Sequence, residues 1–375
     1  MNGATTRVLW LSNETPDVGG QGGQRRQYFQ IRELVAAGIR VDLIALAGPQ
    51  DDASVSALAD VRRVHRHRRF GLPDPRGRGV VARAIRSGSY DVVVVAHVES
   101  WPFVERWAPK RSGPRLLVDA HNVLSAWAEA AGDADRAAAY AAIESLVLDQ
   151  ADAVSVCSDE EEQRLPDGGS AERIVVAHGI EPGEWPEPGT PTGPPSVGAV
   201  GNWNWPPNAS GIEWLVREVW PSVRRRVPDA LFVVAGNGLA ESITTMAGVR
   251  YLGHVADRMS VIGAVDVMAV PVVSGVGAPV KFGEALATGR AVAATRDGAS
   301  AHPSAPAFVS DDSQQWVERL SSWLSDRSAA AEQGRAARSF ALEHLAWART
   351  TRPLVDWIRR GDPGTAQAAG PGSAR

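Results

Sequence analysis

The sequence predicts an α/β protein made of two doubly wound domains, and three observations support that prediction. Short, solidly apolar segments alternate with amphipathic ones along almost the whole chain, as in a parallel sheet covered by helices. One proline-rich segment interrupts this alternation near the middle of the chain, and the alternation then restarts. The length of 375 residues, with 44% of them hydrophobic, suits two domains with sizeable cores.

The first domain is expected over residues 1–181. Its predicted strands are uninterrupted apolar runs, which indicates burial on both faces. They cover residues 7–12, 40–46, 91–97, 115–121, 153–157 and 173–178. Between them, helical periodicity predicts helices over residues 24–38 and 136–151.

A connector is expected over residues 182–196, which hold six prolines between positions 182 and 195. Because proline fixes φ and removes a backbone donor, this segment is expected to be extended and semi-rigid. The second domain is then expected over 197–345. Its predicted strands are 196–201, 230–236, 250–255, 266–271 and 291–295, and its predicted helices lie near 209–219, at 281–289 and within 313–345.

The C-terminal end differs from both domains. Residues 346–360 have an apolar face formed by Trp347, Leu354, Val355 and Ile358, as expected for one more helix. The last residues, 361–375, show no periodicity and are expected to be disordered.

Composition excludes several classes of function. A formal net charge of -4 gives no overall attraction to nucleic acid, and no apolar run approaches the ~18 residues of a membrane-spanning helix. The apolar core near the N-terminus is too short for a signal peptide. The single cysteine, Cys157, cannot form an internal disulfide or a cysteine-based metal site, which fits a reducing cytoplasm. Of the 39 basic residues only Lys110 and Lys281 are lysines, an arginine bias typical of a GC-rich, actinobacterial genome.

The loop after the first predicted strand holds four glycines just before a helix: Gly19, Gly20, Gly22 and Gly23. Bare backbone amides at a helix N-terminus suit an anion such as a phosphate. The pattern is neither GxGxxG nor a P-loop, so a dinucleotide oxidoreductase and an NTPase both lack their motif. A flexible loop with no ligand is the alternative interpretation.

Polar side chains follow two other predicted strands. Asp119, His121 and Asn122 close one strand, and polar groups at the end of a buried strand are costly unless they are used. This favours a functional role for His121 over a structural one. His97 ends another strand and Glu99 follows it, which suggests a second polar cluster.

The most informative segment is SGVGAPVKFGEALATG, at 274–289, a glycine-bearing loop that runs into a helix. Gly275 and Gly277 permit close backbone approach, and the helix N-terminus supplies amides for a diphosphate. Lys281 adds a positive charge one turn into the helix. Glu284 lies on the same helix face, where its carboxylate can accept both hydroxyls of a ribose. An exposed ion pair between these two side chains is the alternative, but it does not explain the glycines.

Together these motifs resemble the GT-B glycosyltransferases of the retaining family 4 type. The resemblance covers nearly all of residues 7–360. It rests on the 253–295 segment, GGQGGQ at 19–24, DAHN at 119–122, HGI at 178–180 and VGNWNWPPNASGIEWL at 200–215. It implies two Rossmann-like domains facing a central cleft, with a C-terminal helix crossing back to the first domain. It also implies a UDP- or GDP-linked sugar as co-substrate, no cofactor and no metal.

The resemblance assigns roles to individual residues. Glu284 would hold the donor ribose, Lys281 the diphosphate, and His121 would contact the transferred sugar or assist the acceptor. These three form the implied catalytic set. The other implied donor-binding positions are Gly22, Gly23, Asn202, His254, Val255, Gly275, Val276, Gly277 and Ala278. Acceptor contacts are implied for Asn13, Glu99, Asn122 and Trp203, although core or hinge packing is the commoner role for such a tryptophan.

The chain also departs from the family pattern. Many relatives carry a glutamate that reads donor-sugar hydroxyls where this chain has Val276. Many carry an Arg and a Lys near the positions occupied here by Asn202 and Trp203. Diphosphate binding therefore depends more heavily on Lys281, and the identity of the sugar does not transfer from the family.

The resemblance leaves the acceptor open. A small molecule of a specialised-metabolite (antibiotic) pathway is the first expectation. A lipid or cell-envelope acceptor is the alternative, reached through membrane contact by the arginine-rich stretch 62–86, which is otherwise simply a solvated surface. An epimerase or phosphorylase on the same scaffold, and a non-catalytic nucleotide-sugar-binding partner suggested by Val276, also remain. No nucleic-acid partner is expected, and the sequence does not indicate the oligomeric state.

Overall fold

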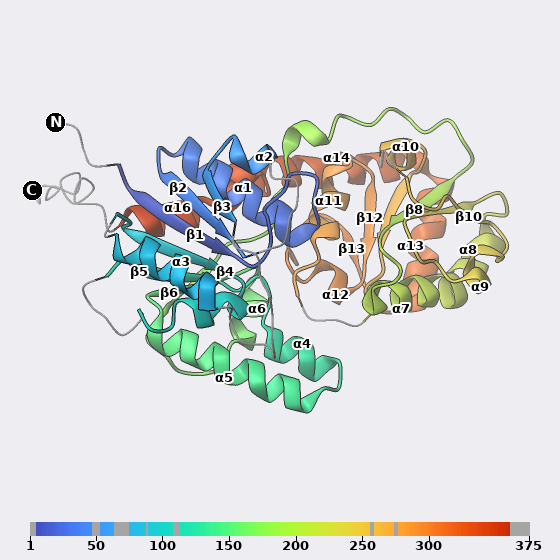
Figure 1. Ribbon diagram of the computed structural model, residues 1–375. Coiled ribbons are helices and arrows are strands. Elements are labelled where there is room, and N and C mark those ends of the chain that lie inside the picture. Colours follow the sequence, from blue (N-terminus) through green and yellow to red (C-terminus); the bar gives the residue numbers. More distant parts are fainter. Residues whose placement is uncertain are drawn as a thin grey trace, which may run out of the picture. The chain divides into compact units, whose positions relative to one another are not determined.

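The computed structural model describes residues 5–46, 53–63, 75–87, 89–107, 113–255, 259–273 and 277–360. The chain forms two compact units, each with its own parallel sheet (Figure 1). Unit 1 is Met1–Ala177 with Trp347–Arg375, and unit 2 is His178–Ala346. The predicted fold class, an α/β protein with two Rossmann-like domains, is thereby confirmed. The segment expected to be a disordered tail, 361–375, lies outside the described residues.

Unit 1 contains a seven-stranded parallel sheet with the order β3-β2-β1-β4-β5-β6-β7. Its strands are β1 (Arg7–Ser12), β2 (Arg40–Ala45), β3 (Asp60–Arg63), β4 (Val92–Ala96), β5 (Arg115–Asp119), β6 (Ala153–Val156) and β7 (Glu172–Val175). The chain runs outward from β1 to β3 and then returns to the other side of β1 at β4. This reversal creates a topological switch point between β1 and β4.

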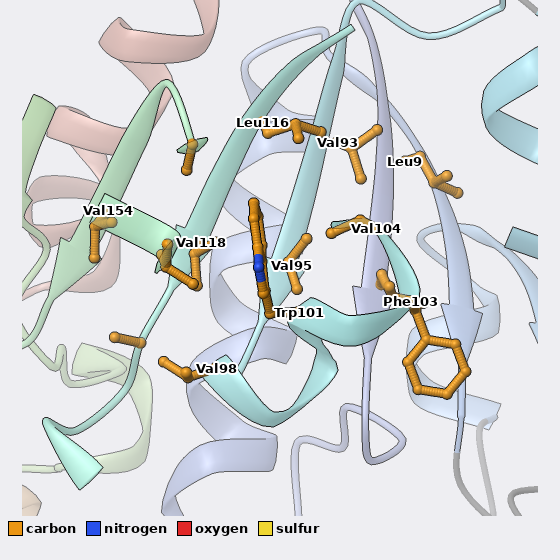
Figure 2. Close-up of a cluster of buried hydrophobic side chains, with 14 of the residues drawn as sticks. Leu9, Val93, Val95, Val98, Trp101, Phe103, Val104, Leu116, Val118 and Val154 are labelled. Carbon is orange, nitrogen blue, oxygen red and sulfur yellow. The ribbon is translucent and has the colours of Figure 1, made fainter. Parts of the chain in front are cut away.

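Helices cover both faces of this sheet, because its central strands are apolar on both sides. They are α1 (Gly22–Ala36), α2 (Ala53–Ser56), α3 (Pro75–Arg86), the 3-10 helix η1 (Val98–Phe103), α4 (Leu124–Ala130), α5 (Ala134–Gln150) and α6 (Asp159–Arg164). On one face, the indole of Trp101 stands in the middle of a buried cluster, among Val95, Val98 and Val118 (Figure 2). At 1% exposure, Trp101 anchors η1 directly after β4.

The C-terminal segment belongs to unit 1, as the predicted return to the first domain requires. It forms α15 (Trp347–Thr350) and α16 (Arg352–Arg359). Trp347 stacks on Phe29 of α1 with ring centroids 5.2 Å apart, and Trp357 donates a hydrogen bond to Glu172 of β7 at 3.0 Å. The predicted apolar face is buried, and its Leu354, Val355 and Ile358 belong to the core cluster on one face of the sheet.

Unit 2 contains a six-stranded parallel sheet with the order β10-β9-β8-β11-β12-β13, the order of a dinucleotide-binding Rossmann fold. Its strands are β8 (Ser196–Val200), β9 (Leu231–Ala235), β10 (Val249–Tyr251), β11 (Val267–Val270), β12 (Ala291–Ala294) and β13 (Phe308–Val309). The switch point lies between β8 and β11. Buried clusters pack on both faces of this sheet, as its apolar strands predict.

The helices of unit 2 include one irregular element. They are the 3-10 helix η2 (Pro182–Glu184), α7 (Pro206–Trp214), the π-helical η3 (Leu215–Val219), α8 (Trp220–Arg226), α9 (Glu241–Thr244), α10 (Met259–Ile262), α11 (Val280–Ala287), α12 (Arg296–Ala299), α13 (Ser313–Ser325) and α14 (Arg327–His344). Sequence periodicity predicted a helix over 209–219, whereas helical structure runs from 206 to 226. Pro221 lies within it, and because proline lacks an N–H, the π turn before it accommodates the missing hydrogen bond.

Candidate functional site

The polar residues predicted in unit 1 follow β1, β4 and β5, at the carboxyl ends of neighbouring strands. Glu14 follows β1 and His97 follows β4, so these two flank the switch point of the sheet. Glu14 Oε1 lies 3.1 Å from His97 Nε2. Gln27 of α1 donates to the same oxygen at 3.1 Å, and its own carbonyl accepts from the Trp10 indole at 3.1 Å. The sheet and α1 therefore hold the Glu14 carboxylate against His97.

His97 and His121 form a pair. Their ring centroids lie 3.8 Å apart with the rings tilted by 44°. Among the described residues these two are the only non-glycine positions with positive φ, 67° and 60°. Such backbone costs about 1–3 kcal/mol at each residue and is typical of functional sites. Both histidines are therefore held in strained positions at the ends of adjacent strands.

Gly23, in the first turn of α1, leaves room for this cluster. A Cβ at this position would lie 2.8 Å from Glu14 Oε1 and 3.4 Å from His121 Nδ1. The first amides of a helix have no partner within the helix, so the N-terminus of α1 presents donors beside the histidine pair. This arrangement suits an oxygen-rich or anionic ligand group.

A buried ion pair lies beneath His121. Arg26 Nη2 and Nε donate to the two Asp119 oxygens at 2.9 and 3.1 Å, and both side chains are fully buried. Ser155 donates to Asp119 at 2.7 Å, and Arg26 also donates to the Val176 carbonyl at 2.7 Å. His121 Nε2 lies 3.1 Å from Asp119 Oδ2, at ion-pair distance but outside hydrogen-bond geometry.

This environment separates the charge states of the two groups. Burial first, and then the neighbouring His97, lower the pKa of His121 to about 4, against a smaller opposing effect of Asp119. Burial alone would raise the pKa of Asp119, but Arg26 and His121 hold it well below its usual value. At neutral pH the imidazole of His121 is therefore neutral beside an ionised carboxylate. It can exchange hydrogen bonds with a hydroxyl without bringing a charge.

Several buried polar atoms near these strand ends have no hydrogen-bond partner within the described chain. They are Asn13 Oδ1, Thr15 Oγ1, Ser100 Oγ and His121 Nε2. Orphaned buried polar atoms are costly and typically mark a site that a ligand or water completes. All four follow β1, β4 or β5, the strands whose ends also carry Glu14 and the histidine pair, which makes this edge of unit 1 a candidate polar ligand site.

In unit 2 the corresponding switch-point site is centred on Lys281, in the first turn of α11. Its Nζ lies 5.4 Å from the centroid of the Trp203 ring. A Cβ on Gly201, directly after β8, would lie 2.5 Å from the same Nζ, so a side chain there would displace the ammonium. Burial lowers the Lys281 pKa to about 8, and Glu284 partly opposes the shift. The ammonium is thus held, partly desolvated, between the ends of β8 and β11.

Lys281 and Glu284 line a common cavity of about 220 Å³ within unit 2. Trp185, Gly201, Met268 and Thr288 are among its other lining residues. The floor of the cavity is therefore apolar, and the two charged side chains of α11 supply its ionic groups. A cation and a carboxylate one helix turn apart suit a ligand with both an anionic part and hydroxyls.

Glycines keep the backbone open around this cavity. Gly236, after β9, has φ of 120°, and a side chain there would overlap the Gly201 carbonyl. Gly277, with φ of 118°, precedes α11, and its carbonyl accepts from Ser300 at 3.4 Å. Both positions need the backbone freedom of glycine.

The residues predicted to bind the donor in unit 2 differ in their exposure and in their contacts. Asn202 is exposed and accepts from Asn204 at 3.2 Å, an interaction that shapes its own loop. His254 is exposed. The residue before it, Gly253, accepts a hydrogen bond from the Gly236 amide at 2.7 Å through its carbonyl. Val255 packs against the core. Ala278 is buried before α11, and the predictions on Gly275 and Val276 lie outside the described residues.

Trp203 is 5% exposed and donates to the Ala235 carbonyl at 3.1 Å, which is the core packing that the sequence also allowed. Its ring also contacts the Lys281 ammonium and so helps to position that group in the cavity. In unit 1, Asn122 is exposed, and Asn13 and Glu99 are half-buried. Acceptor contacts by these four residues stay predictions, as does the role of Gly22 at the start of α1.

Sequence reasoning missed Glu14, Gln27 and Arg26, and it named His97 only as part of a suggested second polar cluster. The available signal was a polar residue at the end of an apolar strand: His97 directly follows β4, and Glu14 comes two residues after β1. The one Asp-x-Asp of the chain, which starts at Asp133, opens α5, where Asp133 accepts from the Arg136 amide at 3.1 Å as a helix cap. Within the described ranges no three His, Cys, Asp or Glu side chains gather as metal ligands, and no helix is long and apolar enough to cross a membrane.

Two protein-family models match this chain. A family model described as "Glycosyl transferase 4-like domain" matches residues 21–180, and one described as "Glycosyl transferases group 1" matches residues 194–326. No curated protein sequence matches the chain.

Solved structures share the fold at low sequence identity. Sucrose-phosphate synthase from Thermosynechococcus elongatus is 17% identical, with a TM-score of 0.70 over 97% of this chain and 100% of that one. HepE from Anabaena, solved with UDP and glucose, is 14% identical, with a TM-score of 0.70 over 95% and 100%. TarM is 10% identical, with a TM-score of 0.76 over 96% and 100%. These structures show that the similarity extends over the whole two-unit architecture.

Proposed function

We propose that this chain, which belongs to the group 1 glycosyltransferases and has their GT-B fold, moves a sugar from a nucleoside-diphosphate sugar to a small-molecule acceptor with retention of configuration. The observation that carries the proposal is the position of Lys281. It lies at the switch point of a Rossmann sheet, partly desolvated, over Trp203 and against Gly201. A lysine in this environment suits a diphosphate.

The donor is assigned to unit 2. Lys281 and the amides at the start of α11 would bind the diphosphate, and Glu284, one turn further, would bind the ribose hydroxyls. The similar HepE structures contain UDP, UDP and glucose, or UDP-glucose, which supports a UDP-linked donor for this chain as well. GDP-linked donors are the second choice.

The sugar is assigned to the polar site of unit 1. The pKa of His121 near 4 keeps its imidazole neutral, so it can bind a sugar hydroxyl without opposing positive charge that develops at the anomeric carbon. Glu14 and His97 add a carboxylate and a second imidazole to the same cluster. In this assignment the sugar hydroxyls would supply hydrogen-bond partners for the buried polar atoms at these strand ends.

The proposed reaction is a front-side displacement. The bond from the anomeric carbon to the diphosphate oxygen breaks, and the acceptor oxygen bonds to that carbon on the same face. The acceptor's proton passes to the departing phosphate oxygen. Lys281 and the helix amides would stabilise the charge on the leaving diphosphate, usually the largest contribution to catalysis, and this supply of positive charge is why we propose a metal-independent transfer.

The basic segment bears on the choice of acceptor. Within the described part of the 62–86 stretch, Arg78 lies 3.6 Å from Glu105, and Arg86 lies over the Trp107 ring at 5.8 Å. These two arginines contact residues of unit 1, and we retain the small-molecule acceptor as the first proposal. Residues 64–74 of the stretch lie outside the described residues. The one cysteine, a buried thiol, fits a reducing compartment such as the cytoplasm.

The decisive experiment measures nucleotide release from UDP- and GDP-sugars by wild type and by Lys281→Ala. We expect kcat/KM to fall by on the order of 100-fold or more, because the variant loses a charge aimed at the leaving group. Arg226→Gln, which removes an exposed charge from α8, is the matched control and should behave as wild type. Activity of Lys281→Ala within a few-fold of wild type would refute the donor assignment. Nucleotide binding without any release by the wild type would instead indicate a non-catalytic binder.

A further inference from the structure

A second cavity, of about 240 Å³, lies within unit 2 between the proline-rich connector and α14. Asp266 and Arg290, which precede β11 and β12, form its base, so it opens at the amino ends of the strands. The candidate donor site lies at the opposite, carboxyl ends. The two cavities are therefore separate sites on one sheet.

Arginines dominate this second cavity. One face of α14 contributes Arg327, Ala331, Arg335 and Arg338, and Arg290 lies at the base. These residues of α14 are spaced by four, four and three, which keeps them on the same side of the helix. Two acidic side chains also line the cavity, Glu187 of the connector and Asp266. Four cations thus surround the cavity against two carboxylates.

The available carboxylates neutralise only one of these cations. Asp266 pairs with Arg327, because its Oδ1 accepts from Arg327 Nε at 2.7 Å, and its Oδ2 accepts from the Ser196 amide at 2.9 Å. Glu187 is exposed on the connector. Within the described chain, no acidic side chain lies at ion-pair distance from Arg290, Arg335 or Arg338.

Arg290 is the sharpest case, since it is only 6% exposed. Its guanidinium donates to three carbonyl oxygens, of Ile262 at 2.9 Å, Gly189 at 2.8 Å and Gly263 at 3.2 Å. A buried charge that has dipoles but no counter-ion is expensive. Burial accordingly lowers the Arg290 pKa, with Asp266 opposing the shift and Arg327 adding to it. The missing partner of this cluster is an anion.

We propose that this cavity binds a small multivalent oxyanion, of the class of inorganic pyrophosphate or a phosphorylated metabolite, with Arg335 as its principal ligand. Arg290 and Arg338 already donate to backbone carbonyls, of which Ala287 accepts from Arg338 at 2.6 Å, and they add positive charge and their remaining N–H groups. A planar guanidinium can bind two phosphate oxygens at once, which makes arginine well suited to such a ligand. The connector carbonyls of Gly189, Pro191 and Gly193 are already held by Arg290 and Arg327. The anion therefore binds where the connector is fastened to unit 2.

The test uses inorganic pyrophosphate as the probe, titrated calorimetrically into the full chain carrying Lys281→Met. That background removes the diphosphate ligand of the candidate donor site, so the proposal stands or falls apart from the proposed transferase activity. Arg335→Gln is the principal variant, because this arginine is exposed on α14 and its loss leaves the fold intact. Arg226→Gln is the control of equal charge on α8. Acetate replaces pyrophosphate as a monovalent probe.

We expect pyrophosphate to bind with Kd below about 1 mM. Arg335→Gln should weaken it about tenfold or more, as a charge-assisted hydrogen bond predicts, whereas Arg226→Gln should leave it within about twofold. Glu187→Gln, which removes the opposing carboxylate, should tighten binding, and acetate should bind much more weakly than pyrophosphate. A phosphorylated sugar that binds more tightly than pyrophosphate would identify an organic ligand of the same site. Absence of binding tighter than about 1 mM, or equal losses in Arg335→Gln and Arg226→Gln, would overturn the proposal.

Discussion

Replacing Asp119 by Asn tests whether the buried ion pair of unit 1 holds the strand ends that present the histidines. The carboxylate accepts two hydrogen bonds from Arg26 and one from Ser155 at 2.7 Å. Neither partner of the ion pair has any exposed side-chain surface. The asparagine is almost the same size, so the perturbation is the loss of one charge and of part of its acceptor capacity.

The magnitude follows from that burial. Removing one member of a buried ion pair leaves the other uncompensated and costs about 3–5 kcal/mol of unfolding free energy. At about 2–4 °C per kcal/mol for a unit of this size, Tm should fall by roughly 6–20 °C. Arg26→Met added to Asp119→Asn should recover part of the loss, because removing both charges costs far less than leaving one of them buried.

The assay is chemical denaturation of the full chain, followed by a fluorescence change assigned to unit 1, since two units need not unfold together. Arg360→Gln is the matched control, because it breaks an exposed ion pair. Arg360 lies 2.6 Å from Glu172, and the two side chains are 58% and 46% exposed. This variant should lose no more than about 1 kcal/mol of unfolding free energy. The pKa of Asp119 is held well below its usual value, so its stabilisation is present above the unfolded-state pKa near 4 and is lost as pH falls through the lower folded pKa. The gap between wild type and variant should therefore narrow in acid. A loss of less than about 1 kcal/mol at pH 7, or a gap that is independent of pH, would refute the reasoning.

Two further predictions concern unit 2. Gly236→Ala should lower the free energy of unfolding by several kcal/mol, because the new Cβ would overlap the Gly201 carbonyl and φ is 120°. Gly38→Ala is the control for backbone strain alone, since its φ is 79° and the space around it is open. Equal losses in the two variants would contradict the overlap argument. The affinity for UDP should fall as pH rises through the Lys281 pKa of about 8, approaching tenfold per pH unit, because the free protein then loses the proton that the bound diphosphate requires. Isothermal titration between pH 7 and about 9.5 measures this slope, and the same slope in Lys281→Ala would show that another group is responsible.

The fold was predictable because its main signal is local. Strands such as β4, with every residue buried, appear in the sequence as apolar runs, and the amphipathic stretches between them have helical periodicity. The elements that were missed are short or have little apolar sequence. β3 consists of DVRR at the edge of its sheet, and β13 has two residues, so neither forms an apolar run. Their pairing depends on neighbours that are distant in the sequence.

The candidate site was predictable only where its residues share one segment. Lys281 and Glu284 lie one turn apart on α11, and the glycines before them are adjacent in sequence. Glu14, Gln27 and His97 come from β1, α1 and the end of β4, and they meet because β1 and β4 are neighbours in a sheet whose strand order departs from sequence order. No local pattern contains that information.

Lysine is rare in this chain, and its presence at position 281 in place of arginine has a physical explanation. Arginine outnumbers lysine 37 to two, and elsewhere in unit 2 it serves the cationic roles. At Lys281 the ammonium must fit beneath a strand end where even one methyl group on Gly201 would lie 2.5 Å away, with the Trp203 ring 5.4 Å from Nζ. A guanidinium is larger, planar and directional, whereas an ammonium is a compact point charge with three rotatable donors. Lysine also has a pKa that burial can bring to about 8, whereas the guanidinium stays charged throughout the accessible pH range. Gly201 and Trp203 therefore define the space around Lys281 Nζ, and substitution at either position should alter where the ammonium lies.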